Sequence, residues 1–198
     1  MAAIFLSASV PIPGRGPFFE TANPFLIQVA VRELVVTTIR EYTLVWGGHP
    51  AITPMIWAVC EDLGVEYSKS VVLYQSRFFE EEYPEENKYF DNVVYVDAVS
   101  GDRDQSIAKM RHAMLSRDDL IAAVFIGGMD GIFEEYRLFR SLHSDAKVLL
   151  IASPGGAARA LAIAAGSPAG NGLDDVDFAR IFRDAFGSDG HTTTTVGS

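Results

Sequence analysis

The chain has 198 residues, 48% hydrophobic and 21% charged, which is the composition of a folded globular protein and excludes a largely disordered one. Its 26 acidic and 16 basic side chains give a formal net charge of −10, so we expect neither nucleic acid nor an anionic membrane as a partner. The single cysteine, Cys60, excludes an internal disulfide and is expected in the core. The four histidines lack the spacing of a metal cage, so we expect no metal and no cofactor.

Short β-rich runs alternate with helical segments along the chain. Asn23 followed by Pro24 is typical of a helix start, and the apolar residues after it recur at helical spacing. Thr53 with Pro54 gives the same signal for a second helix, which Gly64 is expected to end. The sequence predicts strands at residues 4–6, 43–46, 70–74, 93–96, 122–126 and 147–152. It predicts further helices from the cap Asp104, over about 131–142, after 156 and over 173–186.

This alternation predicts an α/β protein with a Rossmann-like open sheet of about six mainly parallel strands and helices on both faces. The strands are continuous apolar runs, as expected when both faces are covered. Within the polar, acidic segment 78–91, Glu80-Glu81-Glu82 and Glu85-Glu86 are expected to form a solvated surface. We assign residues 1–186 to one domain and expect 187–198 to be a disordered tail. No apolar run has the length of a membrane span and no basic leader is present, so we expect a cytoplasmic protein.

Small residues follow three of the predicted strands, at the edge where ligands bind in open parallel sheets. They are Ser7-Ala8-Ser9, Gly47-Gly48 and Gly127-Gly128. Glycines would let the backbone approach a ligand closely, and the helix N-termini opposite offer free N–H groups and partial positive charge. Such an edge can hold a phosphate with few basic side chains. The alternative is that each glycine pair only makes a tight turn.

Two carboxylates follow the last of these turns, at Glu134 and Glu135. Acidic residues in the first turn of a helix complement its dipole, and that alone can explain them. They also face the predicted ligand edge, where a carboxylate could bind ribose hydroxyls, stabilise an oxocarbenium-like centre or orient a water molecule.

The three strand-end segments, taken together, resemble a known superfamily. Phe5-Leu-Ser-Ala-Ser-Val-Pro, Gly47-Gly-His-Pro-Ala-Ile-Thr-Pro and Gly127-Gly-Met-Asp-Gly-Ile-Phe-Glu-Glu are similar to the SLOG superfamily and most similar to its cluster 3 branch. That superfamily joins the Lonely Guy phosphoribohydrolases with nucleotide-ligand sensor domains of TRPM channels and Thoeris defence effectors. The resemblance implies a nucleotide-type ligand and a homodimer.

The match to the enzymes of this superfamily is incomplete. Two residues, Met129 and Asp130, separate the glycine pair from Gly131 where the enzymes have one, and Ile132 replaces their threonine. By resemblance, Glu135 is the enzymes' motif glutamate. Arg77 is the nearest candidate for their catalytic arginine, although its context differs. Both residues would be catalytic only if the protein is an enzyme.

The resemblance and the strand-end geometry together imply a set of ligand contacts. We expect them at Ser7, Ala8, Ser9, Gly47, Gly48, His49, Thr53, Gly127, Gly128, Met129, Gly131 and Glu134. His49 could titrate beside a ligand or be an ordinary polar loop residue, and Thr53 could bind phosphate or only cap its helix. Arg15 could fold over a bound anion or be solvated, while Arg137 could pair with Glu134 or serve a dimer partner.

Two functions remain open on these observations. The first is a sensor or binding module for a nucleotide-derived signal such as an ADP-ribose-like molecule, acting through a separate effector protein. The second is a hydrolase that cleaves the N-glycosidic bond of a nucleoside monophosphate, with Glu135 as its key carboxylate. The shifted glycine and the lost threonine hydroxyl favour the first.

Overall fold

The computed structural model describes residues 1–64, 66 and 70–187. The expected disorder of residues 188–198 therefore lies outside the described residues. No helix within the described ranges is both long enough and apolar enough to cross a bilayer.

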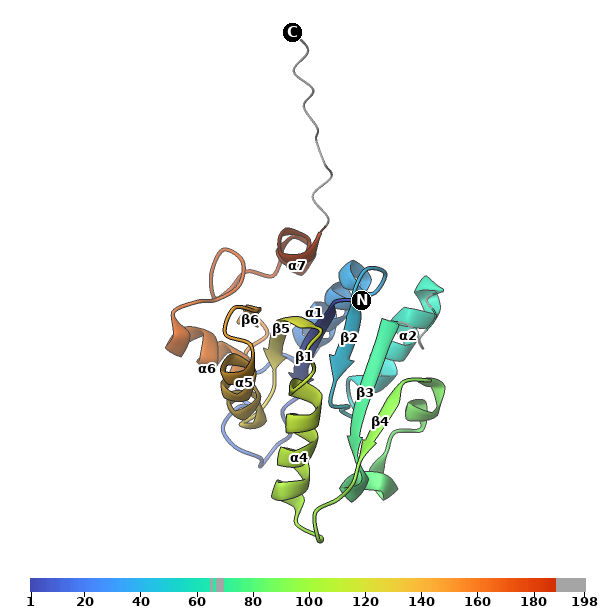
Figure 1. The fold of residues 1–198 in the computed structure, drawn as a ribbon. Helices are drawn as coiled ribbons and strands as arrows, with labels where there is room; N and C mark the ends of the chain where they lie inside the picture. The colour runs from blue at the N-terminus through green and yellow to red at the C-terminus, as the bar shows by residue number, and fades with distance from the viewer. Residues whose placement is uncertain (65, 67–69, 188–198) are drawn as a thin grey trace.

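Six strands form a single sheet in which every neighbouring pair is parallel, so the predicted sheet is confirmed (Figure 1). Their order is β4-β3-β2-β1-β5-β6. The strands are β1 (Ala3–Ser9), β2 (Thr43–Trp46), β3 (Val71–Ser76), β4 (Val93–Val96), β5 (Leu120–Gly127) and β6 (Lys147–Ile151). The chain builds outward from β1 through β2 to β4, and then returns to place β5 on the other side of β1. The order therefore reverses between β1 and β5, and open α/β sheets bind ligands beyond the strand ends at such a point.

Helices cover both faces of the sheet, as predicted (Figure 1). They are α1 (Pro24–Thr38), α2 (Thr53–Leu63), α4 (Arg103–Leu115), α5 (Gly131–Leu142), α6 (Gly156–Ala165) and α7 (Phe178–Phe186). Side chains alternate along β1, so Ile4 and Leu6 pack with α1, α2 and α7 in one core cluster. Phe5 lies on the other face, in the cluster formed with α4, α5 and α6.

The predicted helix ends are partly confirmed. Asn23 caps α1, with its Oδ1 accepting the Leu26 N–H at 3.1 Å, and Gly64 ends α2 with a φ of +62°. Two predicted caps are wrong. Thr53 is the first helical residue of α2, and its Oγ1 instead accepts the backbone N–H of His49 at 3.3 Å. The cap of α4 is Asp102, two residues before the predicted Asp104, because its Oδ1 reaches the Gln105 N–H at 3.0 Å.

The acidic segment after β3 folds into two short 3-10 helices, η1 (Arg77–Glu82) and η2 (Glu85–Tyr89), and its Glu80, Glu81, Glu82 and Glu85 are exposed, as expected of a solvated surface. One segment differs from its predicted form. The last helix begins at Phe178 rather than at residue 173, because the Asp177 carboxylate accepts the Arg180 N–H and starts the helix there.

Candidate functional site

Three elements bring polar side chains together at the point where the strand order reverses. Glu135, in the first turns of α5, receives a hydrogen bond on Oε2 from Ser7 Oγ of β1 at 2.5 Å. Its other oxygen, Oε1, accepts from Arg111 Nε of α4 at 3.0 Å. The Glu135 side chain is only 16% exposed and that of Arg111 22%, so this ion pair is largely withdrawn from water.

The local sequence explains this convergence. Because side chains alternate along β1, Ser7 points to the face covered by α4 and α5, opposite to its neighbour Leu6. Glu135 lies four residues after Gly131 on α5, so the two share one side of that helix. Arg111 lies on α4, which packs against α5, and its Nε donates to Glu135, so its side chain bridges the two helices.

Arg111 is the functional candidate that sequence reasoning missed. Arg77, the predicted arginine, lies at the end of β3 and pairs with Glu80 at 3.0 Å and with Asp97 at 3.5 Å. Its side chain is 44% exposed, and its guanidinium lies over the Tyr95 ring. The structure therefore brings Arg111, and not Arg77, to Glu135. No sequence pattern singles out Arg111, because its role depends on how α4 packs against α5.

The glycine turn after β5 is shaped by the protein's own packing. Gly127 and Gly128 have φ values of +62° and +76°, a region that favours glycine. The Gly128 N–H donates to the Ser9 carbonyl at 2.8 Å, and the Gly128 carbonyl accepts from the Ala157 N–H at 3.0 Å. A Cβ on Gly128 would lie 2.2 Å from Ile132 Cδ1. These glycines are required by the fold itself, whatever binds beside them.

Gly131 contributes to the polar cluster directly. A Cβ there would lie 2.4 Å from Nη2 of Arg111. The absence of a side chain at the start of α5 therefore makes room for the guanidinium. Arg111 reaches Glu135 across the first turn of this helix, whose Ile132 and Phe133 N–H groups donate to the Met129 and Asp130 carbonyls at 3.0 and 3.1 Å.

The turn after β2 is occupied by side chains of the protein. A Cβ on Gly48 would lie 1.7 Å from Nε2 of Gln75, a buried residue of β3. His49 is half-buried, and its Nδ1 accepts the Ala51 N–H at 3.2 Å. Burial lowers the pKa of His49, which favours the neutral ring that this hydrogen bond requires. Thr53 is fully buried, so its hydroxyl serves the turn.

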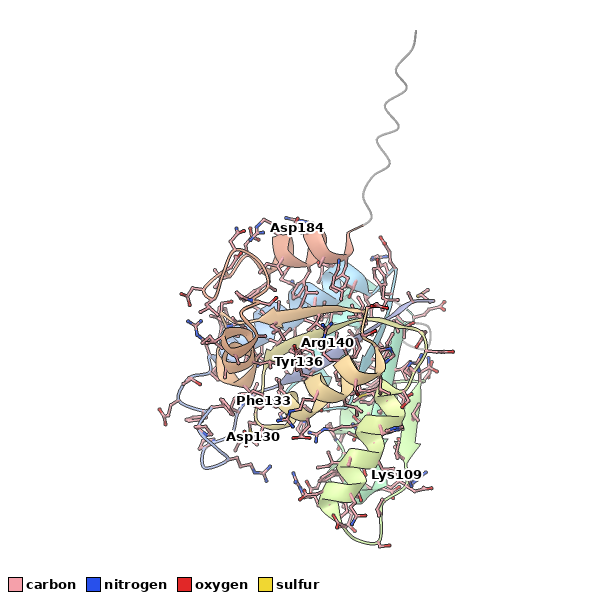
Figure 2. All side chains as sticks on the ribbon, turned by 60° about the vertical axis from the view of Figure 1, so that its left-hand side comes forward. Lys109, Asp130, Phe133, Tyr136, Arg140 and Asp184 are labelled. Atoms are coloured by element: carbon pink, nitrogen blue, oxygen red, sulfur yellow. The ribbon has the colours of Figure 1, made fainter. Side chains whose placement is uncertain are left out.

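The other predicted contacts lie around the cluster. Glu134 is exposed and pairs with Arg137 at 2.8 Å, pointing away from its neighbour Glu135. Met129 and Ala8 are half-buried, as are Ser9 and Gly47. The loop after β1 runs past the beginning of α5, where Figure 2 labels Asp130 and Phe133. The ring of Phe18, a residue of this loop, lies with its centroid 6.1 Å from that of the Phe133 ring. Arg15 in this loop is exposed.

An open pocket of about 420 Å³ adjoins the cluster between α4 and α5. Its lining residues are Ala108, Arg111, Glu134, Arg137, Leu138 and Ser141. Arg111 therefore both pairs with Glu135 and lines this open groove. The described residues contain no cluster of three side chains that could hold a metal ion.

Comparison with known proteins places this geometry in a family. No curated protein matches the sequence significantly. The model of the SLOG cluster3 family matches residues 17–186, which is most of the chain. The chain therefore belongs to the SLOG cluster3 family.

Proposed function

We propose that this protein binds a nucleotide or a nucleotide-derived ligand, such as an ADP-ribose-like signal, at the carboxyl ends of β1 and β5, and acts as a sensor or binding module. The observation that carries this proposal is the withdrawn ion pair of Arg111 and Glu135 at the start of α5, at the reversal of strand order. Family membership is consistent with a nucleotide-related role.

The free donors of Arg111 support a phosphate-bearing ligand. Its Nε is occupied by Glu135, and within the described residues its two Nη groups make no hydrogen bond. A guanidinium with two free Nη groups can bind a phosphate through paired hydrogen bonds. The positive end of the α5 dipole lies beside it and adds to the attraction for an anion. Glu135 orients the arginine and keeps lone pairs that can accept a hydrogen bond from a ribose hydroxyl.

Two features favour binding over catalysis. Both oxygens of Glu135 already accept hydrogen bonds, one of them from a cation, so the protein's own donors hold the carboxylate in place. Ile132 is buried and packs in the core, so the position offers no hydroxyl for a reacting group. The N-terminal contacts of α5 can hold a ligand without completing a hydrolytic site.

A hydrolase is the second candidate. Glu135 is mostly buried and fixed by two partners, and a fixed carboxylate at a ligand edge can stabilise positive charge developing on a ribose or position a water molecule. In that case Glu135 acts on the N-glycosidic bond of a nucleoside monophosphate. Arg111 is better placed than Arg77 to act with it.

The assembly and location belong to the same proposal. We propose a cytoplasmic homodimer whose ligand state is transmitted to a separate effector protein, since a binding module needs an output. Sedimentation equilibrium over a hundredfold concentration range tests the dimer. A monomer mass at every concentration would exclude it.

The decisive experiment identifies the ligand and asks whether it is turned over. Purified protein is denatured, and released nucleotides are identified by mass spectrometry. The wild type, Glu135→Gln and the exposed α2 control Glu61→Gln are then incubated with AMP and ADP-ribose, and free base is measured. A binding module retains the nucleotide and releases no base, and Glu135→Gln changes affinity by about 1–3 kcal/mol.

A hydrolase gives a different result in the same assay. It releases base, and Glu135→Gln slows release by about two to four powers of ten while binding persists. If Glu135→Gln matches the wild type in affinity and in base release, Glu135 is only a helix-terminal charge, and both candidate functions lose their central residue.

A further inference from the structure

The edge strand β4 directs backbone groups away from the sheet. β4 is the outer strand at one end of the sheet, so only β3 pairs with it (Figure 1). The Leu73 N–H of β3 donates to the Asn92 carbonyl at 2.9 Å, and backbone groups alternate in direction along a strand. Val93 and Tyr95 therefore point their N–H and C=O groups outward. Within the described residues, neither makes a backbone hydrogen bond on that side.

The other edge of the sheet is covered by the chain itself. On β6, the Leu150 carbonyl accepts the Ala169 N–H at 2.9 Å, so a later segment lies along that strand. Natural proteins cover, shorten or charge their edge strands, because an open edge pairs with other chains. β4 is four residues long, and the side chains of Val94 and Tyr95 on its two faces are 38% and 43% exposed. This edge is short, but it offers apolar contacts on both sides to an added strand.

Acidic side chains surround the open edge. Asp91 precedes β4 and Asp97 follows it, with a side chain that is 80% exposed. The centroid of the Tyr83 ring, directly after η1, lies 5.8 Å from that of the Tyr95 ring, so the end of η1 adjoins the strand. Residues 77–97 carry seven acidic and two basic side chains, so this stretch holds half of the net charge of −10.

The two basic side chains are already paired, Arg77 with Asp97 at 3.5 Å and Lys88 with Glu85 at 3.2 Å. Several exposed acids pair with no cation of the described residues, namely Glu81, Glu82 and Asp91. A second copy is a poor occupant, because two β4 strands related by a two-fold axis run antiparallel. Pairing their outward residues would place Asp91 of one copy opposite Asp97 of the other, and like charges there are destabilising. The complementary occupant is basic.

We propose that β4 binds an extended segment of a partner protein that carries lysine or arginine and adds a seventh strand to the sheet. The segment exchanges backbone hydrogen bonds with Val93 and Tyr95, and its apolar side chains cover Val94. Its basic side chains pair with the acids around the strand, which selects the partner by charge. β2 and β3 separate β4 from β1, so this surface is distinct from the candidate nucleotide site and does not depend on it.

Nuclear magnetic resonance tests the proposal on the whole ¹⁵N-labelled protein with a synthetic peptide, in which a Val-Thr-Val centre lies between two pairs of lysines. At saturation, amide exchange at Val93 and Tyr95 should slow at least about fivefold, while Val94 and Val96, whose N–H groups already face β3, stay unchanged. A peptide N-methylated at the residues that face β4 keeps its charge and should bind at least about tenfold more weakly. A peptide with glutamate in place of lysine should not bind.

Two variants restrict the test to one backbone group. Tyr95→Pro and Tyr95→Thr both remove the ring, but only proline removes the outward N–H, which the ladder with β3 does not use. The lysine peptide should bind Tyr95→Pro at least about fivefold more weakly than Tyr95→Thr. The N-methylated peptide decides the matter if Tyr95→Pro fails to fold.

Four results would overturn the proposal. The lysine peptide might leave Val93 and Tyr95 unprotected, the N-methylated or the glutamate peptide could bind as well as the lysine peptide, or the two variants could bind it equally. Protection of Val93 and Tyr95 that rises with protein concentration in the absence of peptide would show that a second copy occupies the edge.

Discussion

Two regions at the carboxyl edge of the sheet carry similar sequence signals and differ in structure. At the ends of β1 and β5, a glycine turn borders Ser7 and the Arg111–Glu135 ion pair, whose charges are largely withdrawn from water. At the ends of β2 and β3, a glycine turn is filled by Gln75, and the charged Arg77 is exposed. In the first region, hydrogen bonds to the Glu135 carboxylate connect β1, α4 and α5. The second region packs like an ordinary turn.

A glycine pair after a strand can indicate either a tight turn or a ligand site. At the two turns, positive φ values and close neighbours explain Gly48, Gly127 and Gly128 without a ligand. A charged pair that is mostly buried and still borders an open groove is not explained by turn geometry. The candidate site therefore differs from the turn after β2 in two ways. Its ion pair is mostly buried, and the two Nη groups of Arg111 make no hydrogen bond within the described residues.

The largest effect should come from closing the space beside Gly48. Gly48→Ala adds a Cβ that would lie 1.7 Å from Nε2 of the buried Gln75, at a φ of +70°. We expect a loss of about 2–4 kcal/mol in the free energy of unfolding, measured by urea denaturation. In the double variant with Gln75→Ala, the two losses should be less than additive. A loss below about 0.5 kcal/mol would mean that this turn is open to a ligand after all.

The next largest loss of stability is expected from replacing Arg111, compared with replacing Arg77. Arg111→Met leaves the Glu135 carboxylate without its cation at a site that is only 16% exposed, so we expect a loss of about 1–3 kcal/mol in unfolding free energy. Arg77→Met breaks an exposed pair and should cost less than about 0.5 kcal/mol. Equal losses in urea denaturation would remove the distinction between the two regions.

A smaller effect should appear on acidification at the β2 turn. Burial lowers the pKa of His49 below its ordinary value of 6.5, so the unfolded chain binds the proton more tightly than the folded protein. Its contribution to stability is complete above pH 6.5 and is lost as the pH falls through the lowered pKa. Between pH 7.5 and 5.5 the wild type should lose more unfolding free energy than His49→Gln does, by up to about 1 kcal/mol. Identical pH profiles of unfolding would contradict this.

The smallest effect on stability is expected at Gly131. Gly131→Ala should displace the flexible end of Arg111, whose Nη2 would lie 2.4 Å from the new Cβ. Alanine stabilises a helix by roughly 0.5–1 kcal/mol relative to glycine, which offsets the weakened ion pair. We expect an unfolding free energy within about 0.5 kcal/mol of the wild type, but weaker AMP binding by calorimetry. Unchanged affinity would show that the position of Arg111 is immaterial.

Much of the fold was readable from the sequence, because continuous apolar strands between amphipathic helices have few arrangements. The strand 43–46 and the helix over 131–142 were predicted with their observed bounds. The caps at Thr53 and Asp104 were wrong, since the choice between neighbouring cap residues depends on which side chain reaches a free N–H. Arg111 could not be predicted, because its role depends on the packing of two helices that are separate in the sequence.

The affinity of AMP for three proteins tests the central claim most directly. Isothermal titration at one fixed salt concentration compares the wild type with Arg111→Met and Arg77→Met. If the phosphate binds at the start of α5, Arg111→Met weakens AMP binding at least about tenfold, while Arg77→Met changes it by less than about twofold. If AMP binds the wild type and Arg111→Met equally, or if only Arg77→Met weakens binding, the ligand site is not at the ends of β1 and β5.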